Sequence, residues 1–198
     1  MDEAGAPRVR AFVVDAAPVR RHADWRSVGM RSSGTHSFSL AGAWVPEGQA
    51  FDIRPEAATD PGTLYRFPFT ELAWVTLAAN LSGMALAFLH AAEQRARAAG
   101  RDGVLALVRT TRDGLWPVRA RALDTLDSAW AQLDAGEALD PVCAADLRAR
   151  SAQLVHTARR AVDEVYPACG LLAAHEDSRL NRIWRDLHTA TQHAMLRP

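Results

Sequence analysis

The sequence predicts an α+β fold that is mainly helical, with a C-terminal four-helix bundle preceded by a short β segment. Apolar stripes with helical spacing recur after residue 67 and are joined by short connections, whereas residues 8–50 show strand and turn chemistry. Hydrophobic residues form 48% of the 198-residue chain, which is sufficient for one sizeable core. We expect a partial β domain over 1–52, a linker over 53–66 and the bundle over 67–198.

The β segment contains two stretches that favour strands. The run "RVRAFVVD" is rich in β-branched and aromatic residues, and "GMRSSGTHSFSLAGAWVPEG" is rich in Gly and Ser. In the second stretch, His36, Phe38 and Leu40 alternate with small residues, which predicts a half-buried strand. In the following linker, two prolines and the "TDPG" turn interrupt any periodicity.

Four helices are expected after the linker. The first covers about 69–99 and ends at Gly100, and the second begins after Pro117 and continues to Leu133. Asp140 is the predicted N-cap of the third helix, with Pro141 as its first residue. The segment "YPACG" kinks or stops that helix, and the fourth covers about 178–195.

Composition excludes several classes of function. The chain holds 23 basic residues, all of them arginine, and 23 acidic residues, so no net charge attracts it to nucleic acid. Without lysine there is neither a Schiff-base nor a P-loop lysine. Two cysteines and the lack of HExxH and CxxC motifs predict no metal site. The N-terminus lacks a signal-peptide pattern, which predicts a cytoplasmic protein.

One segment is apolar enough to require a test against the membrane. Residues 72–92 carry no Asp, Glu, Lys or Arg, and 21 residues are long enough to span a bilayer. The stretch contains several polar groups and many alanines, and a helix that is apolar all round is also typical of a bundle centre. We therefore expect a buried helix and no membrane association.

The end of the chain, "RIWRDLHTATQH", concentrates groups that bind or titrate. Arg185, His188 and Gln192 fall on one helical face and could bind an anionic or polar ring, with His188 moving a proton. The residues alone favour a plainer interpretation, a solvated outer face of a terminal helix. The loop "SSGTHS", with Gly34, Thr35 and His36, likewise favours an ordinary polar turn.

Three segments in order resemble one known family. "DWRSVGMRSSGTHSFSLAGAWVPEGQAFD" resembles the second half of the middle β domain in the acyl-CoA dehydrogenase superfamily. "EVYPACG" and "RLNRIWRDLHTATQH" look like C-terminal segments of its oxygen-using branch, the two-component flavin-dependent monooxygenases. The resemblance covers nearly the whole chain from about residue 8, and it identifies the β segment as part of that middle domain.

The resemblance implies a site and a cofactor. It places His188 near the reactive edge of a flavin as the catalytic residue, and makes Arg185 and Asp186 cofactor-binding residues that position helix and histidine. Gly34, Thr35 and His36 would form part of the pocket wall. The flavin, FMN or FAD, would arrive reduced from a separate reductase, and a small aromatic or similar substrate would react with O2.

Family members are much longer, so the resemblance also implies an incomplete site. We expect a flavin-dependent oxidoreductase whose site is completed by a separate N-terminal-half chain or by an oligomer formed through the helical bundle; whether the chain is active alone is left open. Two alternatives remain open: a non-catalytic assembly subunit or remnant with the same fold, and a dehydrogenase-type binder of CoA thioesters. No carboxylate can be assigned by motif to the dehydrogenase role, which disfavours that reaction.

Overall fold

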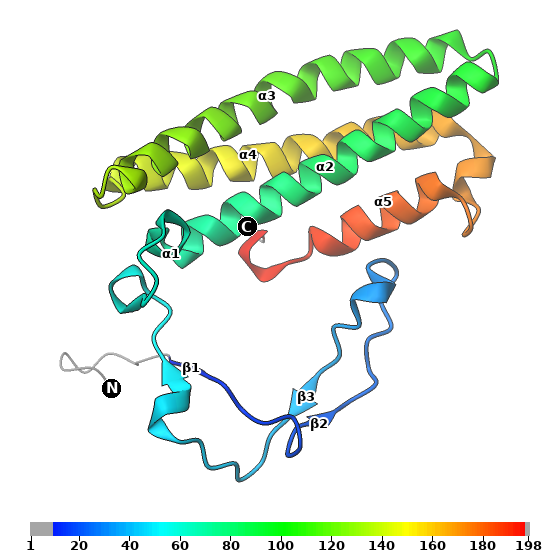
Figure 1. Ribbon diagram of the computed structural model, residues 1–198. Coiled ribbons are helices and arrows are strands. Elements are labelled where there is room, and N and C mark those ends of the chain that lie inside the picture. The colour runs from blue at the N-terminus through cyan, green and yellow to red at the C-terminus, as the bar shows by residue number, and fades with distance from the viewer. Residues whose placement is uncertain (1–9, 197–198) are drawn as a thin grey trace.

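The computed structural model describes residues 10–196 and confirms the mainly helical α+β class. Four long helices pack together, and a small β segment projects from one side of them (Figure 1). Residues 1–9, on which the prediction of no signal peptide rests, and residues 197–198 lie outside the described part of the chain.

The elements follow in chain order. The strands are β1 (Ala11–Phe12), β2 (Arg20–Arg21), β3 (Phe38–Ser39) and β4 (Ala50–Phe51). The helices are α1 (Thr63–Arg66), α2 (Phe69–Ala98), α3 (Asp102–Asp134), α4 (Pro141–Val165) and α5 (Arg179–Ala190). Short 3-10 turns occupy Arg31–Ser33, Glu47–Gln49, Pro55–Ala57, Tyr166–Cys169, Leu171–Ala174 and Ala194–Leu196.

Helix α2 is the centre of the bundle, because it packs against α3, α4 and α5. Phe88 and Leu89 on this helix are fully buried, and Leu81 nearly so. Its length and hydropathy alone would also suit a membrane span, and 33% of its most apolar window is buried among the described residues. One such helix is weak evidence for a span, since the core helix of a bundle shows the same composition.

The second helix differs from the prediction. Helix α3 begins at Asp102 and continues through Pro117, whereas the sequence predicted a start after that proline. Pro117 and Trp116 are on the exposed side of the helix. A proline there leaves an unpaired carbonyl one turn earlier, and water can satisfy an exposed carbonyl. The apolar stripe on the opposite side continues unbroken and holds both halves in one helix.

The third and fourth helices follow the sequence more closely. Asp140 caps α4, with its Oδ1 accepting hydrogen bonds from the backbone N–H of Val142 at 2.7 Å and of Cys143 at 3.1 Å. Helix α4 ends at Val165, directly before the predicted "YPACG" stop. Helix α5 ends at Ala190, five residues before the predicted end, and a turn and a short 3-10 segment follow it.

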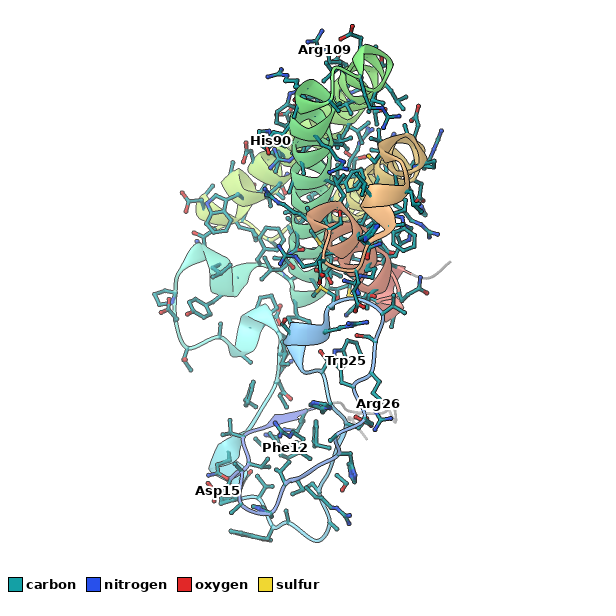
Figure 2. The ribbon with its side chains drawn as sticks, turned by 90° about the vertical axis from the view of Figure 1, so that its right-hand side faces the viewer. Phe12, Asp15, Trp25, Arg26, His90 and Arg109 are labelled. Atoms are coloured by element: carbon teal, nitrogen blue, oxygen red, sulfur yellow. The ribbon has the colours of Figure 1, made fainter. Side chains whose placement is uncertain are left out.

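The β segment is only loosely ordered into strands. Strand β1 pairs antiparallel with β4 and β2 with β3, each over two residues. A strand does form at Phe38–Ser39, but the expectation that it is half-buried is wrong, because Phe38 is 69% exposed and no second layer covers it among the described residues. Phe12 also lies far from the helices, whereas Trp25 lies at the junction with them (Figure 2).

Candidate functional site

Two backbone amides of the β segment dock onto side chains of α5. The N–H of Gly29 donates to Thr189 Oγ1 at 2.9 Å, and the N–H of Met30 donates to Asp186 Oδ1 at 2.5 Å. Asp186 and Thr189 are three residues apart, so they lie on the same face of the helix. This joint connects the two segments, about 160 residues apart, that carry the family resemblance.

The backbone at the joint leaves little freedom. Gly29 is buried, and a Cβ at this position would overlap the backbone carbonyl of Arg185. Met30 adopts the left-handed conformation, with φ of 53°, which is uncommon for a residue with a side chain. Its carbonyl accepts from Trp25 Nε1 at 3.0 Å and from Ser33 Oγ at 2.7 Å, and these contacts hold the turn.

A group of three charged side chains closes the outer edge of the joint. Arg31 Nη1 donates to Glu176 Oε1 at 2.6 Å, and Arg185 Nη2 donates to the Glu176 carbonyl at 3.2 Å. The hydrogen bond and charge of Arg31 hold the pKa of Glu176 below its ordinary value, with a smaller contribution from Arg185. Arg185 Nε is buried and has no hydrogen-bond partner within residues 10–196.

His188 lies on a different side of α5, two residues and about 200° from Asp186. Its Nε2 is 2.8 Å from Oδ1 of Asp163 on α4. Its ring lies 4.5 Å from that of Trp184, which stacks on Tyr166 at 5.0 Å. A carboxylate can only accept, so this pairing keeps a proton on Nε2 and leaves Nδ1 as the nitrogen available for proton transfer.

The predicted loop of Gly34, Thr35 and His36 is connected to the joint by hydrogen bonds. Gly34 has a positive φ of 56°, and Thr35 Oγ1 lies 2.9 Å from Ser33 Oγ. His36 Nδ1 accepts from the backbone N–H of Trp25 at 3.0 Å, so this nitrogen is unprotonated. The loop is therefore connected to α5 through Trp25 and Met30.

The structure brings some of the predicted site residues together and separates others. Asp186 and the loop share the docking joint, and Arg185 approaches it through Glu176. His188 faces α4, and within residues 10–196 no hydrogen bond or ion pair links it to Gly34, Thr35 or His36. Arg185 and His188, which were predicted to share one face, thus contact different neighbours. Arg185 contacts Glu176, and His188 contacts Asp163.

Sequence reasoning missed the residues that hold these groups. The three-residue spacing of Asp186 and Thr189 could have indicated a shared face, but no sequence signal marks Gly29 and Met30 as their partners. Asp163 is one of several acidic residues on α4, and only the packing of α4 against α5 distinguishes it. Among the described residues, no group of three or more His, Cys, Asp or Glu could hold a metal ion.

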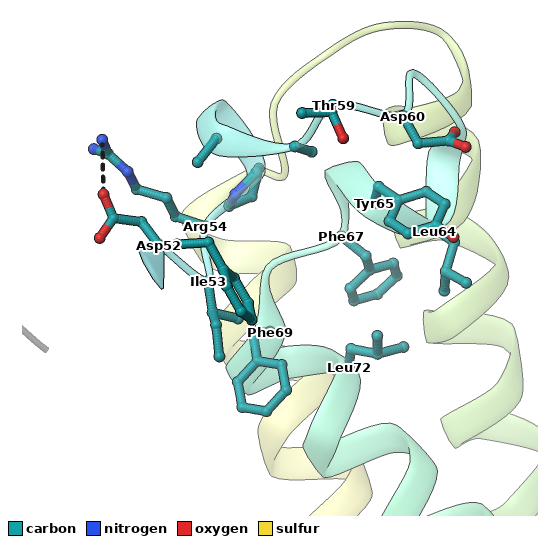
Figure 3. A pocket seen from close by; sticks show the side chains of 14 residues that line it. Asp52, Ile53, Arg54, Thr59, Asp60, Leu64, Tyr65, Phe67, Phe69 and Leu72 are labelled. Carbon is teal, nitrogen blue, oxygen red and sulfur yellow. Dashed lines mark ion pairs between the residues drawn. The ribbon is translucent and has the colours of Figure 1, made fainter. Parts of the chain in front are cut away.

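An apolar cavity of about 610 Å³ lies where the β segment, the linker and the start of α2 meet (Figure 3). Ile53, Phe67, Phe69 and Leu72 gather around it, and an Asp52–Arg54 ion pair at 3.6 Å lies at its edge. Helix α5 runs alongside α2 with its C-terminal end directed toward the start of α2 (Figure 1). Such an apolar cavity with few polar groups is typical of sites for small organic ligands.

Comparison with known proteins decides the family. The family described as "Acyl-CoA dehydrogenase, C-terminal domain" matches residues 75–198, which is more than half of the chain. The chain belongs to this family. The match covers the whole bundle except the start of α2, in agreement with the helical architecture.

Among the relatives of this chain is a flavin-dependent monooxygenase subunit. A "Pigment production hydroxylase" of Rhodococcus erythropolis is 28% identical over 190 residues, covering 86% of this chain and 48% of the relative. The "Flavin-dependent monooxygenase, oxygenase subunit HsaA" of Rhodococcus jostii is 26% identical, covering 93% and 53%. The chain therefore spans about half the length of these relatives.

A solved structure shows the same arrangement of the β segment and bundle. XiaF from a Streptomyces species, solved with FADH2 and glycerol, superposes with a TM-score of 0.80 at 26% identity. The match covers 94% of this chain and 52% of XiaF. It extends over nearly all of the chain and so includes the small β segment as well as the helices.

The fit of Gly29 against α5 can be tested by substitution. In Gly29→Ala the added Cβ meets a backbone carbonyl that cannot move aside, so both joint hydrogen bonds should be lost. We expect amide hydrogen exchange over residues 24–37 to accelerate by about tenfold or more, since each lost bond contributes about 1 kcal/mol. Exchange in the core of α2 should not change.

The matched control is Gly48→Ala, where an added Cβ meets no neighbouring atom. Equal exchange rates over residues 24–37 in the two variants would contradict the role of Gly29.

The charged edge of the joint predicts a pH dependence. Because Arg31 lowers the pKa of Glu176 in the folded protein, the contact favours docking above the ordinary pKa of glutamate. This contribution is lost as the pH falls through the lowered pKa. In Arg31→Ala, the pKa of Glu176 should rise toward its ordinary value, as measured by carboxyl NMR titration. Arg121→Ala on α3 is the control, and an unchanged pKa in Arg31→Ala would exclude the contact in solution.

Proposed function

We propose that this chain is the C-terminal part of the oxygenase component of a flavin-dependent monooxygenase. The observation that supports this most directly is the hydrogen-bonded joint between Gly29–Met30 and Asp186–Thr189. It connects the β segment to the last helix. The matches to the relatives cover 86% and 93% of this chain. XiaF, solved with FADH2, supports a flavin as the cofactor.

The residues present fit a flavin in part. Ser33, Thr35 and His36 offer hydroxyls and an imidazole in a loop that turns at the left-handed residue Gly34, which suits the polar side of the cofactor. Asp186 and Arg185 are already engaged in holding the β segment, so they would act by positioning that loop. A bound reduced flavin would supply the electrons for reaction with O2; a separate reductase would reduce it.

His188 and Asp163, on the side of α5 that faces α4, would handle a proton once a ligand is brought to them in the completed enzyme. Asp163 orients the imidazole and keeps Nε2 protonated, and Trp184 fixes the ring from the side. Nδ1 is then able to accept a proton from a bound ligand or return one. The side chain of His188 is 21% exposed, so a ligand or a completing polypeptide can still reach it.

The substrate would be a small apolar molecule, with an aromatic ring as the best fit. Phe51, Tyr65, Phe67 and Phe69 line the cavity together with aliphatic side chains. Aromatic walls favour flat rings because offset and edge-to-face contacts add to the burial of apolar area. The ion pair at the edge could orient one polar substituent of such a ring.

A further polypeptide would complete this site. The two-residue strands leave backbone groups unpaired, and Phe12, Trp44 and Phe51 are each about half or more exposed. Relatives about twice as long contain additional residues that could cover these side chains. The completing part could be a separate N-terminal-half chain, with a homo-oligomer formed through the bundle in the cytoplasm.

The same exposure favours a second candidate, a non-catalytic assembly subunit. If the β segment remains uncovered, the pocket wall is incomplete and the bundle alone would serve as a scaffold. Such a protein would self-associate and bind no flavin in either oxidation state. The dehydrogenase-type alternative would instead require affinity for CoA thioesters.

Flavin binding tests the proposed function first. The purified chain is titrated with FMN and FAD, oxidised and anaerobically reduced, and binding is followed by flavin fluorescence and calorimetry. We expect binding of the reduced form to strengthen when the completing N-terminal polypeptide is added. The Gly29→Ala variant should bind more weakly than Gly48→Ala because its pocket wall is undocked. No binding with the completing polypeptide present would favour the assembly subunit.

The role of His188 is tested in the completed enzyme. In His188→Ala we expect less substrate hydroxylation per reduced flavin consumed and more release of hydrogen peroxide, with a fall of about 10²-fold or more in product formation. Asp163→Asn should also lower product formation and raise peroxide release, but less strongly, because it removes only the group that orients the imidazole. His193→Ala is the comparison, because this exposed imidazole follows the end of α5. A normal yield in His188→Ala, or a larger loss in His193→Ala, would remove His188 from the reaction.

A further inference from the structure

One ring nitrogen of the β segment has two neighbours that require opposite protonation states. His36 Nδ1 accepts a hydrogen bond from the backbone N–H of Trp25 at 3.0 Å. The same nitrogen lies 3.8 Å from Oδ1 of Asp24. An N–H group can only donate and a carboxylate can only accept, so the first contact requires Nδ1 without a proton and the second requires Nδ1 with one. The nitrogen can therefore satisfy only one of these neighbours at a time.

The contact between His36 and Trp25 is connected to the docking joint by further hydrogen bonds. Trp25 lies where the β segment meets the helices (Figure 2). Its indole Nε1 donates to the carbonyl of Met30 at 3.0 Å, and the N–H of Met30 donates to Asp186 on α5. Because His36 fixes the backbone of Trp25, loss of this contact frees the indole that holds the turn at Met30. The protonation of one imidazole is thus coupled to the docking of the β segment.

Asp24 is held in position to receive the protonated ring. Hydrogen bonds from Ser37 hold the pKa of Asp24 below its ordinary value, with a smaller contribution from the charge of His36. One of these bonds joins the backbone N–H of Ser37 to Asp24 Oδ1 at 2.9 Å. The carboxylate therefore stays charged over the pH range in which imidazoles ordinarily gain a proton. The side chain of His36 is 22% exposed, so a proton from water can reach it.

The other charged groups of the joint have partners of their own. Asp186 accepts from the backbone, and Arg31 pairs with Glu176 at 2.6 Å. Arg31 also holds the pKa of Glu176 below its ordinary value, so this pair stays charged over the same pH range. Within residues 10–196, no carboxylate other than that of Asp24 forms an ion pair with His36. The response of this ring to pH therefore depends on Asp24 and the Trp25 N–H.

A second histidine of the β segment provides a comparison. His22 Nε2 lies 2.9 Å from Ser39 Oγ. A hydroxyl can donate or accept, so this contact is compatible with either protonation state of the ring. His36 differs because its partner is a backbone N–H, which cannot accept.

We propose that His36 is a pH-sensitive switch that keeps the β segment docked on α5 when neutral and releases it when protonated. When Nδ1 gains a proton, the contact with Trp25 is lost, the imidazolium pairs with Asp24, and the turn at Met30 loses its support. The released state binds one more proton than the docked state. Docking is therefore favoured above the pH range in which imidazoles titrate, and it weakens as the pH falls through that range. The switch acts on docking and does not depend on the proposed reaction.

Amide hydrogen exchange of the 198-residue chain at different pH values tests the switch. Each rate is divided by the rate of an unstructured peptide at the same pH, which leaves the protection factor. Between about pH 7.5 and about pH 5.5, protection over residues 24–37 should fall about tenfold, as expected for the loss of one or two hydrogen bonds. Protection in the core of α2 should not change.

Two variants separate the two neighbours of the ring. His36→Asn keeps an acceptor near the position of Nδ1 but does not titrate, so protection over residues 24–37 should be the same at both pH values. Asp24→Asn removes the charge that stabilises the imidazolium and keeps an oxygen for Ser37. The midpoint of its response should move to lower pH by about half a pH unit.

His22→Asn is the matched control, because it makes the same change at a histidine whose partner is a hydroxyl, and it should keep the full response of the parent. Equal protection of the parent chain at both pH values would overturn the proposal. So would a full response in His36→Asn, or its loss in His22→Asn. If His36→Asn is unprotected at both pH values, Asp24→Asn decides, and an unmoved midpoint there overturns the switch.

Discussion

The docking of two backbone amides onto α5 is the interaction on which the rest of the site depends. The β segment has four strands of two residues each and no covered core among the described residues, so its own pairing cannot hold it in place. The backbone N–H groups of Gly29 and Met30 hold the β segment in place by donating to Thr189 and Asp186. The close approach is possible because Gly29 has no Cβ. The loop that contains Thr35 takes its position from that contact. A polar loop is thereby presented beside a helix rather than left free in solvent.

The bundle provides the rigid side of this arrangement. Helix α2 packs against three neighbours, and α5 lies along it with Leu187 fully buried. A row of rings leads outward from this core, from Phe88 through Tyr166 and Trp184 to His188. Each ring restricts the next, so the orientation of His188 is set by packing as well as by a hydrogen bond to α4. Aromatic contacts of this kind add to apolar burial and favour one side-chain geometry.

The β segment and the outer face of α3 expose different kinds of groups. The β segment exposes unpaired strand edges and scattered apolar side chains, which more β structure can cover. The outer face of α3 exposes two indoles in part, Trp116 at 49% and Trp130 at 40%. Scattered side chains of this kind on a continuous helix leave no backbone group unpaired, whereas the β segment does.

The sequence by itself determined the helical class, most of the helix ends and the cap at Asp140, because periodicity and capping are local properties. It did not determine the path of α3 through Pro117, since the buried stripe on the far side outweighs a proline whose lost hydrogen bond faces water. It also failed at Phe38, where alternation suggests burial but no second layer is present in the described part of the chain. For the site, the motifs shared with the family pointed to the last helix and the Gly-Thr-His loop. Only the tertiary structure decided that Asp186 holds Met30 and that His188 pairs with a carboxylate of α4. Both contacts join residues distant in the chain, and hydrogen bonds between packed elements leave no periodic signal in the sequence. Helix spacing can place side chains on a face, but what lies opposite that face is set by packing.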